Sequence, residues 1–278
     1  MEIIHQLVFK SREEPKLFQF LESTGIKFKA VKLPDNSGLY VSAQIEESNP
    51  AWSSMSRFID KENILHSFET IFSEREILDA EWLRVVNVFE HGYPQPENEW
   101  IKKPNNYGEF CASCGVFKQT KPYYIFKEPT LGKNKFMSLI WTGDSLFTVP
   151  EVIEALKNNQ IKGIEVWEVM IHKSKQPARS IFQIFIPEIT APSLLDKESL
   201  AKSTCSGCGV TKYEYHRYGK MFYKQNGIPQ GVDIVRTHEW FGSGHLAYRE
   251  ILISNRLAKI IIDSKWKGLR MKVVQLIM

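Results

Sequence analysis

The chain has 278 residues, of which 43% are hydrophobic and 24% are charged, and its formal net charge is +4. Such a composition is typical of a globular protein of about two domains and excludes a fibrous or disordered chain. The basic residues are spread along the chain, so a nucleic-acid partner is not expected, because phosphate binding needs a concentrated basic face.

No apolar run of about 18 residues is present, which argues against a membrane-spanning helix. The first residues, from Met1 to His5, lack the basic segment and the long apolar run of a signal peptide. We therefore expect a cytoplasmic protein whose cysteines stay reduced. Reduced cysteines favour metal or redox chemistry over disulfide bonds.

Residues 1–100 are expected to form an N-terminal domain of mixed α/β structure. Its first strand is predicted by the apolar residues of segment 3–9. Ser11 and Glu14 have the spacing of a helix capping box, and Gly25 marks the end of the helix that would follow.

Two further strands are predicted at 26–33 and 39–45, because the segment between them has the Pro, Asn and Gly residues of a turn. A second helix is expected to begin at Ser73 and to turn inward an apolar face made of Ile77, Leu78, Trp82 and Leu83. The Pro- and Gly-rich segment 88–110 shows little periodicity and is interpreted as the linker to the next domain.

Residues 101–278 contain a degenerate internal repeat, with copies at about 105–187 and 200–278. The turn Cys-x-x-Cys-Gly that starts at Cys111 returns at Cys205. Each copy is expected to contain this turn, then strands, a helix, a Lys-Gly turn and a closing strand.

Within the copies, residues 146–166 match residues 251–271. The second copy holds additional residues, which we expect around 241–244. The match pairs three apolar positions of one predicted helix with three of the other, namely Val152, Ile153 and Leu156 with Leu257, Ala258 and Ile261.

All four cysteines of the chain lie in the two turns, as Cys111, Cys114, Cys205 and Cys208. Two thiolates separated by two residues can hold one edge of a zinc tetrahedron, and the glycine that follows supplies the positive φ of such a turn. One structural Zn²⁺ shared by both pairs is the leading interpretation, and it requires the two copies to fold against each other. The fold class is thus expected to be α+β, with a mixed α/β N-terminal domain followed by a duplicated, zinc-stabilised α+β region.

Three alternatives stay open for these cysteines. They are two separate sites, a redox dithiol, and buried cysteines without metal. Separate sites would need further ligands such as His172, His216, His238 or His245.

The sequence shows no recognisable catalytic motif, and we predict no catalytic residue. One alternative function is a zinc enzyme with an open metal position near a carboxylate such as Glu239. Another is nucleic-acid binding through the aromatic and basic stretch 212–224, although paired strands with aromatic packing are favoured there.

The doubled Cys-x-x-Cys-Gly turn, the helix start at 254–256 and the closing Lys-Gly strand resemble the bacterial double-CXXCG motif family over residues 105–278. Some members of this family are associated with toxin-immunity systems, which implies a cognate toxin as a protein partner. Only the four cysteines carry over as functional positions, and this chain has about 100 additional residues at its N-terminus. The expected function is that of a zinc-binding, non-enzymatic interaction protein, with toxin immunity as one biological setting.

Overall fold

The computed structural model describes all 278 residues except 36–37, 88, 99–105, 121–123 and 196–199. The protein has a mixed α+β structure, as expected, with five α-helices in the described part. None of the helices in that part is long and apolar enough to cross a membrane. The chain divides into two compact units, unit 1 with Met1–Ser73 and Arg217–Gly219, and unit 2 with Glu74–His216 and Lys220–Met278.

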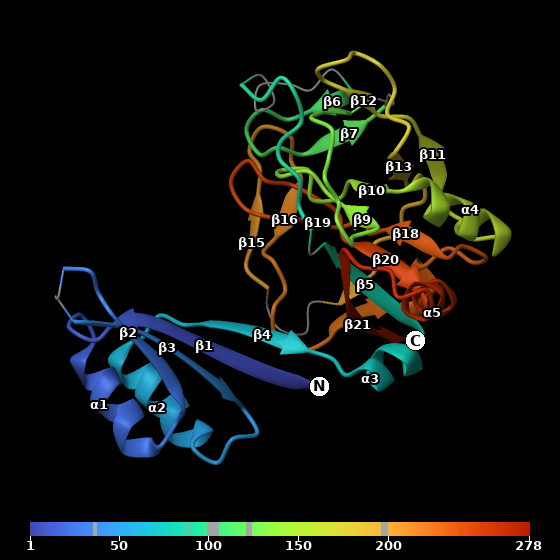
Figure 1. Cartoon of the computed structure of the whole chain (residues 1–278). Coiled ribbons are helices and arrows are strands. Elements are labelled where there is room, and N and C mark those ends of the chain that lie inside the picture. The colour runs from blue at the N-terminus through green and yellow to red at the C-terminus, as the bar shows by residue number, and fades with distance from the viewer. Residues whose placement is uncertain (36–37, 88, 99–105, 121–123, 196–199) are drawn as a thin grey trace. The chain divides into compact units, whose positions relative to one another are not determined.

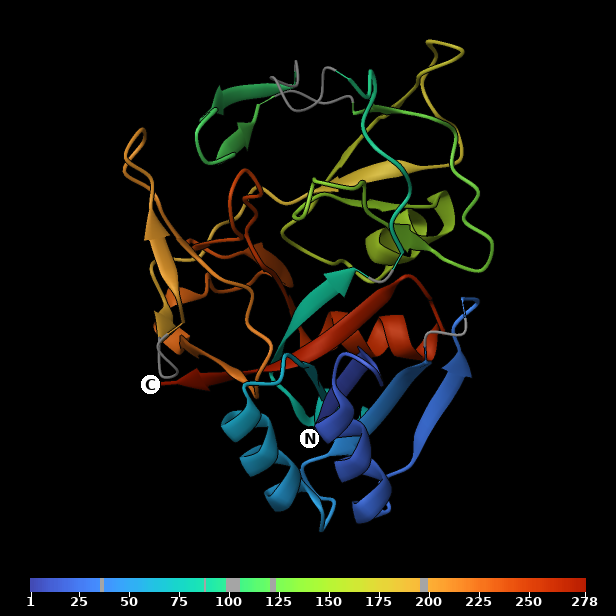
Figure 2. The same cartoon turned by 90° about the vertical axis from the view of Figure 1, so that its left-hand side faces the viewer.

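Unit 1 is a four-stranded antiparallel sheet in the order β2-β3-β1-β4, with both of its helices on one face (Figure 1; Figure 2). Because β3 lies between β1 and β2, the first three elements form a split β-α-β motif. Its elements are β1 (Glu2–Lys10), α1 (Pro15–Thr24), β2 (Phe28–Lys32), β3 (Leu39–Glu46), α2 (Trp52–Glu62) and β4 (Ser67–Ile71).

Strands β1, β2 and β3 follow the sequence prediction, whereas β4 was not predicted. The predicted end of α1 is confirmed, since Gly25 adopts φ 68° at the helix terminus. The predicted capping box is wrong, because Ser11 Oγ accepts a hydrogen bond from Leu39 N at 3.0 Å and α1 begins at Pro15. Helix α2 was not predicted from the sequence, because it buries only Met55 and Ile59 among many polar residues. Residues 36 and 37 of the predicted turn lie outside the described residues.

Unit 2 begins with a short helix, α3 (Glu74–Asp79), followed by β5 (Trp82–Asn87). A helix begins directly after Ser73, as predicted, but its predicted continuation through Trp82 and Leu83 is wrong, because both residues belong to a strand. The remaining elements are β6 (Tyr107–Phe110), β7 (Phe117–Gln119), β8 (Ile125–Phe126), β9 (Phe136–Met137), β10 (Leu146–Thr148), α4 (Pro150–Asn158), β11 (Glu165–Trp167), β12 (Met170–Ile171), β13 (Phe182–Phe185), β14 (Leu194–Leu195), β15 (Lys202–Thr204), β16 (Thr211–Tyr213), β17 (Met221–Lys224), a 3₁₀ helix (Gln225–Gly227), β18 (Ile234–Arg236), β19 (Trp240–Phe241), β20 (Ile251–Ser254), α5 (Asn255–Asp263) and β21 (Leu269–Ile277).

The internal repeat appears in unit 2 as two matching sheets. One has the order β11-β13-β10-β9, and the other contains the series β21-β5-β20-β18. In each, a middle strand that lies outside the matched segment pairs antiparallel with both neighbours, and these middle strands are β13 and β5. Because β5 completes the sheet of the second copy, the division between units falls at Ser73, earlier than the linker expected at 88–110.

The two copies pack on one hydrophobic core. The predicted inward positions of both helices are buried and belong to the same cluster, namely Val152, Ile153, Leu156, Leu257, Ala258 and Ile261. The Lys-Gly turns then make reciprocal contacts: a Cβ on Gly163 would lie 2.4 Å from Ile234 O, and one on Gly268 would lie 2.2 Å from Phe136 O. Each turn thus presses on an edge strand of the other copy's sheet, β18 or β9, and only glycine fits there.

Buried charges join β5 to the rest of unit 2. Arg84, which is 1% exposed, pairs with Glu250 at 2.8 Å and donates a hydrogen bond to His216 O at 3.1 Å. Burial, together with the positive charges of Arg84 and Lys272, lowers the pKa of His216 to about 4. The imidazole is therefore neutral in the folded protein at pH 5, where an exposed histidine is protonated.

This depressed pKa predicts an acid-sensitive component of stability. As the pH falls below the usual histidine pKa, His216 becomes protonated in the unfolded chain but stays neutral in the folded protein. The free energy of unfolding therefore decreases by about 2 kcal/mol between pH 7 and pH 5. In His216→Gln this part of the pH slope is expected to be absent in urea unfolding experiments. The matched variant His238→Gln removes an exposed histidine of the same unit and keeps the wild-type slope; equal slopes in all three proteins would contradict the prediction.

Candidate metal centre

The two cysteine turns sit at the ends of two short β-hairpins of unit 2. Strands β6 and β7 bracket the first turn, and β15 and β16 bracket the second. The turns share one hydrogen-bond pattern: Cys111 N donates to Val116 O and Cys205 N to Val210 O, at 2.8 and 2.9 Å. The repeated sequence thus folds twice into the same local structure.

The glycine after each pair has the conformation that the sequence predicted. Gly115 has φ 76° and Gly209 has φ 74°, and the amide of each donates to the carbonyl of the first cysteine of its turn, both at 2.8 Å. A side chain at either position would place an L-residue in the left-handed region, which disfavours every residue but glycine.

The hairpins bring the four cysteine sulfurs together, although 94 positions separate the two members of each matched pair. All four Sγ atoms lie within 4.8 Å of one another, with Cys111 Sγ 3.9 Å from Cys205 Sγ and Cys114 Sγ 3.6 Å from Cys208 Sγ. Zinc–sulfur bonds of about 2.3 Å in a tetrahedron give sulfur–sulfur edges of about 3.8 Å. Both measured distances are close to that edge and far from the roughly 2.05 Å of a disulfide.

Even without a metal ion, backbone amides of the turns favour the thiolate form of the first cysteine in each pair. Backbone amides of Cys114 and Ser113 point at Cys111 Sγ and lower its pKa to about 6, and amides of Cys208 and Gly207 lower the pKa of Cys205. Burial has the opposite effect on Cys114, whose pKa rises to about 12. A cation at the centre would favour the deprotonated form of this buried thiol, because a coordinating thiol loses its proton.

Apolar contacts hold the hairpins beside each other. The ring of Phe117 packs edge-on against Trp240 with centroids 5.7 Å apart, and β19, which carries Trp240, pairs with β16. The valines that follow the two glycine positions, Val116 and Val210, pack on the same core cluster. In Figure 2 the green and orange hairpins accordingly approach each other at their turns.

A loop of the second copy forms a seat for the first turn. The loop after β19 passes so close to Gly115 that a Cβ there would lie 1.8 Å from His245 O. Gly209 has no atom within 4 Å of the same position. The additional residues that the sequence predicts in the second copy, around 241–244, adjoin this contact, whose part in the metal centre the sequence did not indicate.

The histidines considered as further ligands do not join the sulfurs. Among the described residues, the four cysteines are the one group of Cys, His, Asp and Glu side chains whose ligand atoms lie close enough to hold a metal ion. His216 is buried, while the side chains of His238 and His245 are exposed and that of His172 is half-buried.

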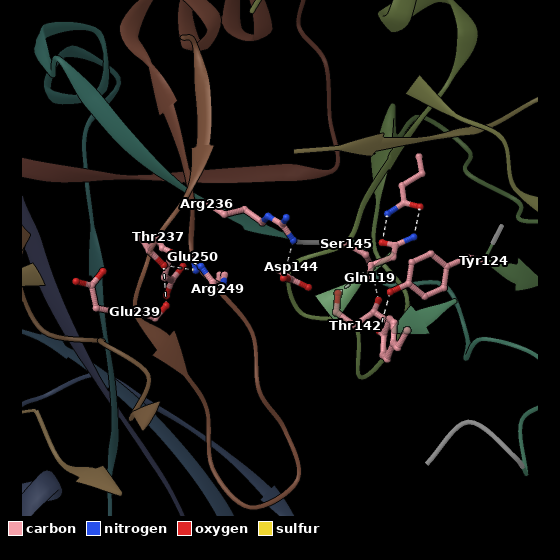
Figure 3. Close-up of polar contacts among 12 residues, drawn as sticks. Gln119, Tyr124, Thr142, Asp144, Ser145, Arg236, Thr237, Glu239, Arg249 and Glu250 are labelled. Carbon is pink, nitrogen blue, oxygen red and sulfur yellow. Dashed lines mark hydrogen bonds and ion pairs between the residues drawn. The ribbon is translucent and has the colours of Figure 1, made fainter. Parts of the chain in front are cut away.

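Glu239, which a zinc enzyme could have used, holds the backbone. Its Oε1 accepts hydrogen bonds from Ser193 N and Leu194 N at 2.7 and 2.9 Å. It belongs to a buried polar region that the sequence analysis missed, drawn in Figure 3, where Arg236 points toward Asp144 with 3.6 Å between their charged atoms. Nearby, Gln119 and Gln183 exchange two amide hydrogen bonds at 3.0 and 2.8 Å and tie the first hairpin to β13.

The stretch 212–224 does not offer a continuous exposed aromatic face. Lys212 is 3% exposed and Tyr223 is fully buried. Strands form there, as favoured from the sequence, but β16 and β17 belong to different sheets and do not pair with each other.

No protein-family model matches the chain, and a search of curated proteins finds no match. The resemblance to the double-CXXCG motif family therefore depends on the motif and its spacing alone.

The unequal surroundings of the two glycines predict unequal costs of substitution. Gly209→Ala should lower the free energy of unfolding by about 1–2 kcal/mol, the cost of a left-handed alanine. Gly115→Ala should lose about 1–3 kcal/mol more, because its methyl group must displace the His245 carbonyl. Urea unfolding of both variants measures the difference, and thiol titration of the native proteins shows whether the four sulfurs become more accessible. Equal losses in the two variants would mean that the loop does not press on Gly115.

Proposed function

We propose that one Zn²⁺ ion, bound by Cys111, Cys114, Cys205 and Cys208, links the two hairpins of the repeat and stabilises unit 2. The observation that carries this proposal is the group of four sulfurs within 4.8 Å of one another on two turns of the same geometry. Four thiolates in a tetrahedron are typical of structural zinc, with iron as the other metal that such a set holds.

A structural role follows from the number of ligands. Catalytic zinc keeps one coordination position for water or substrate, whereas four thiolates close the tetrahedron. Glu239 is bonded to two backbone amides and is not one of the four ligands, which disfavours the zinc-enzyme alternative.

Purified, reduced protein is expected to contain one zinc ion per chain by elemental analysis and to lack the visible absorption of an iron–sulfur centre. Because zinc binds the folded state, chelation should lower the free energy of unfolding, by about 4 kcal/mol where free zinc had been a thousandfold above its dissociation constant. Cys208→Ser should lose the metal, while Ser206→Ala, in the same turn, should keep it. Wild-type protein that binds no zinc, or that binds iron instead, would remove the proposal.

The second part of the proposal is that the protein acts by binding a protein partner, a cognate toxin, as an immunity factor. It rests on the resemblance to the double-CXXCG motif family, some of whose members are associated with toxin-immunity systems. A metal centre closed by four thiolates fits such a role, because it organises a surface without reacting.

Toxin immunity predicts protection of a cell that makes the toxin. Candidate toxins are those encoded beside the gene, and co-expression with this chain should restore growth and yield a complex that co-purifies. Cys111→Ser, which removes a proposed zinc ligand, should weaken both effects, whereas Ser206→Ala should preserve them. Failure of wild-type protein to protect or bind, despite normal zinc content, would overturn the immunity role and leave the structural zinc intact.

A further inference from the structure

Lys212 occupies an unusual position beside the candidate metal centre. It lies on β16, four residues after Cys208, and is 3% exposed. Its ammonium donates to three backbone carbonyls, those of Cys114 at 2.8 Å, Gly244 at 2.7 Å and Leu246 at 3.0 Å. A lysine ammonium has three N–H groups, so every donor of Lys212 is used.

These contacts join the parts that the centre has to bring together. Lys212 belongs to the hairpin of the second turn, and Cys114 belongs to the first turn. Gly244 and Leu246 belong to the loop that presses on Gly115 through His245. One side chain therefore fixes the first turn and its seat relative to the second.

The charge of Lys212 also lacks an ordinary partner. Buried lysines are rare unless they are paired, yet none of the ion pairs between described residues includes Lys212. Its three partners are neutral carbonyl groups. A divalent metal held by four thiolates carries a net double negative charge, and a cation bonded to the carbonyl of a ligand residue lowers the cost of burying it.

The first copy holds a lysine at the matching position. Lys118 follows Cys114 by four residues, as Lys212 follows Cys208. Its side chain is 66% exposed and lies 3.6 Å from the Glu109 carboxylate, on the surface of the first hairpin. The same residue type in the same place of the repeat therefore has two different environments.

From these contacts we propose that Lys212 is a positioning residue of the metal centre, which ties the two cysteine turns together and offsets the negative charge of the metal–thiolate group. The inference rests on the proposed zinc site and adds to it a residue that is not a ligand.

The test compares Lys212→Met with Lys118→Met, using Zn²⁺ alone as the ligand and a chromophoric chelator as the competitor. Lys212→Met is expected to bind zinc at least tenfold more weakly and to release it faster, whereas Lys118→Met should stay within about twofold of wild type. Lys212→Arg, which keeps the charge, should retain more affinity than Lys212→Met.

A lysine that only supports the fold would behave differently in one respect. It would stabilise the zinc-free and zinc-loaded proteins equally, whereas the proposed role predicts that Lys212→Met destabilises the zinc-loaded form more. Lys212→Gln, which keeps amide donors without the charge, provides the same comparison should the methionine variant not fold. Unchanged zinc affinity, or equal destabilisation of both forms, would overturn the inference while wild-type zinc content still supported the site itself. If wild-type protein bound no zinc, the proposed zinc site itself would be overturned.

Discussion

Unit 2 depends on the packing of its two repeat copies against each other. The inward faces of α4 and α5 share one core, and each Lys-Gly turn lies against an edge strand of the opposite copy's sheet, at Ile234 and Phe136. Neither copy could bury its helix alone, because half of the apolar partners come from the other copy. Reciprocal packing also explains how distant cysteine turns meet. Once the cores are joined, the hairpins that precede them in the chain project from fixed positions of one body.

The metal centre adds an electrostatic condition to this packing. Four thiolates attract a cation but repel one another, and burial raises the pKa of Cys114. The turn amides stabilise charge on Cys111 and Cys205, and we propose that zinc and Lys212 supply the rest. The hydrophobic contact between Phe117 and Trp240 is independent of any metal. Packing thus brings the sulfurs near one another, and the proposed ion would select the arrangement in which all four are deprotonated.

The sequence predicted what local patterns specify. The inward helix positions of both copies and the positive φ of Gly115 and Gly209 follow from periodicity and turn chemistry, and the structure agrees with them. The sequence could not predict β5 and β13 as middle strands, because their partners lie far away along the chain. Residue type alone also gave no indication that Lys212 is buried, although the matching Lys118 shows in the sequence that a lysine recurs at this position. Whether such a recurring lysine is buried depends on the loop after β19, where the sequence predicts an insertion and whose carbonyls Lys212 contacts.

That insertion makes the two halves of the centre unequal. The first turn is covered, with Cys114 buried and Gly115 pressed by His245, while the second is open, with Cys208 exposed and free space around Gly209. The two turns share one backbone pattern, so the asymmetry arises from the loop after β19, which contacts Gly115 and not Gly209. Solvent therefore has its most direct access to the cluster at Cys208, and the first turn is the more enclosed half. A metal in such a centre would be held chiefly through the fold of the covered turn, since the exposed turn is bound to the body of the protein mainly through β16 and Lys212.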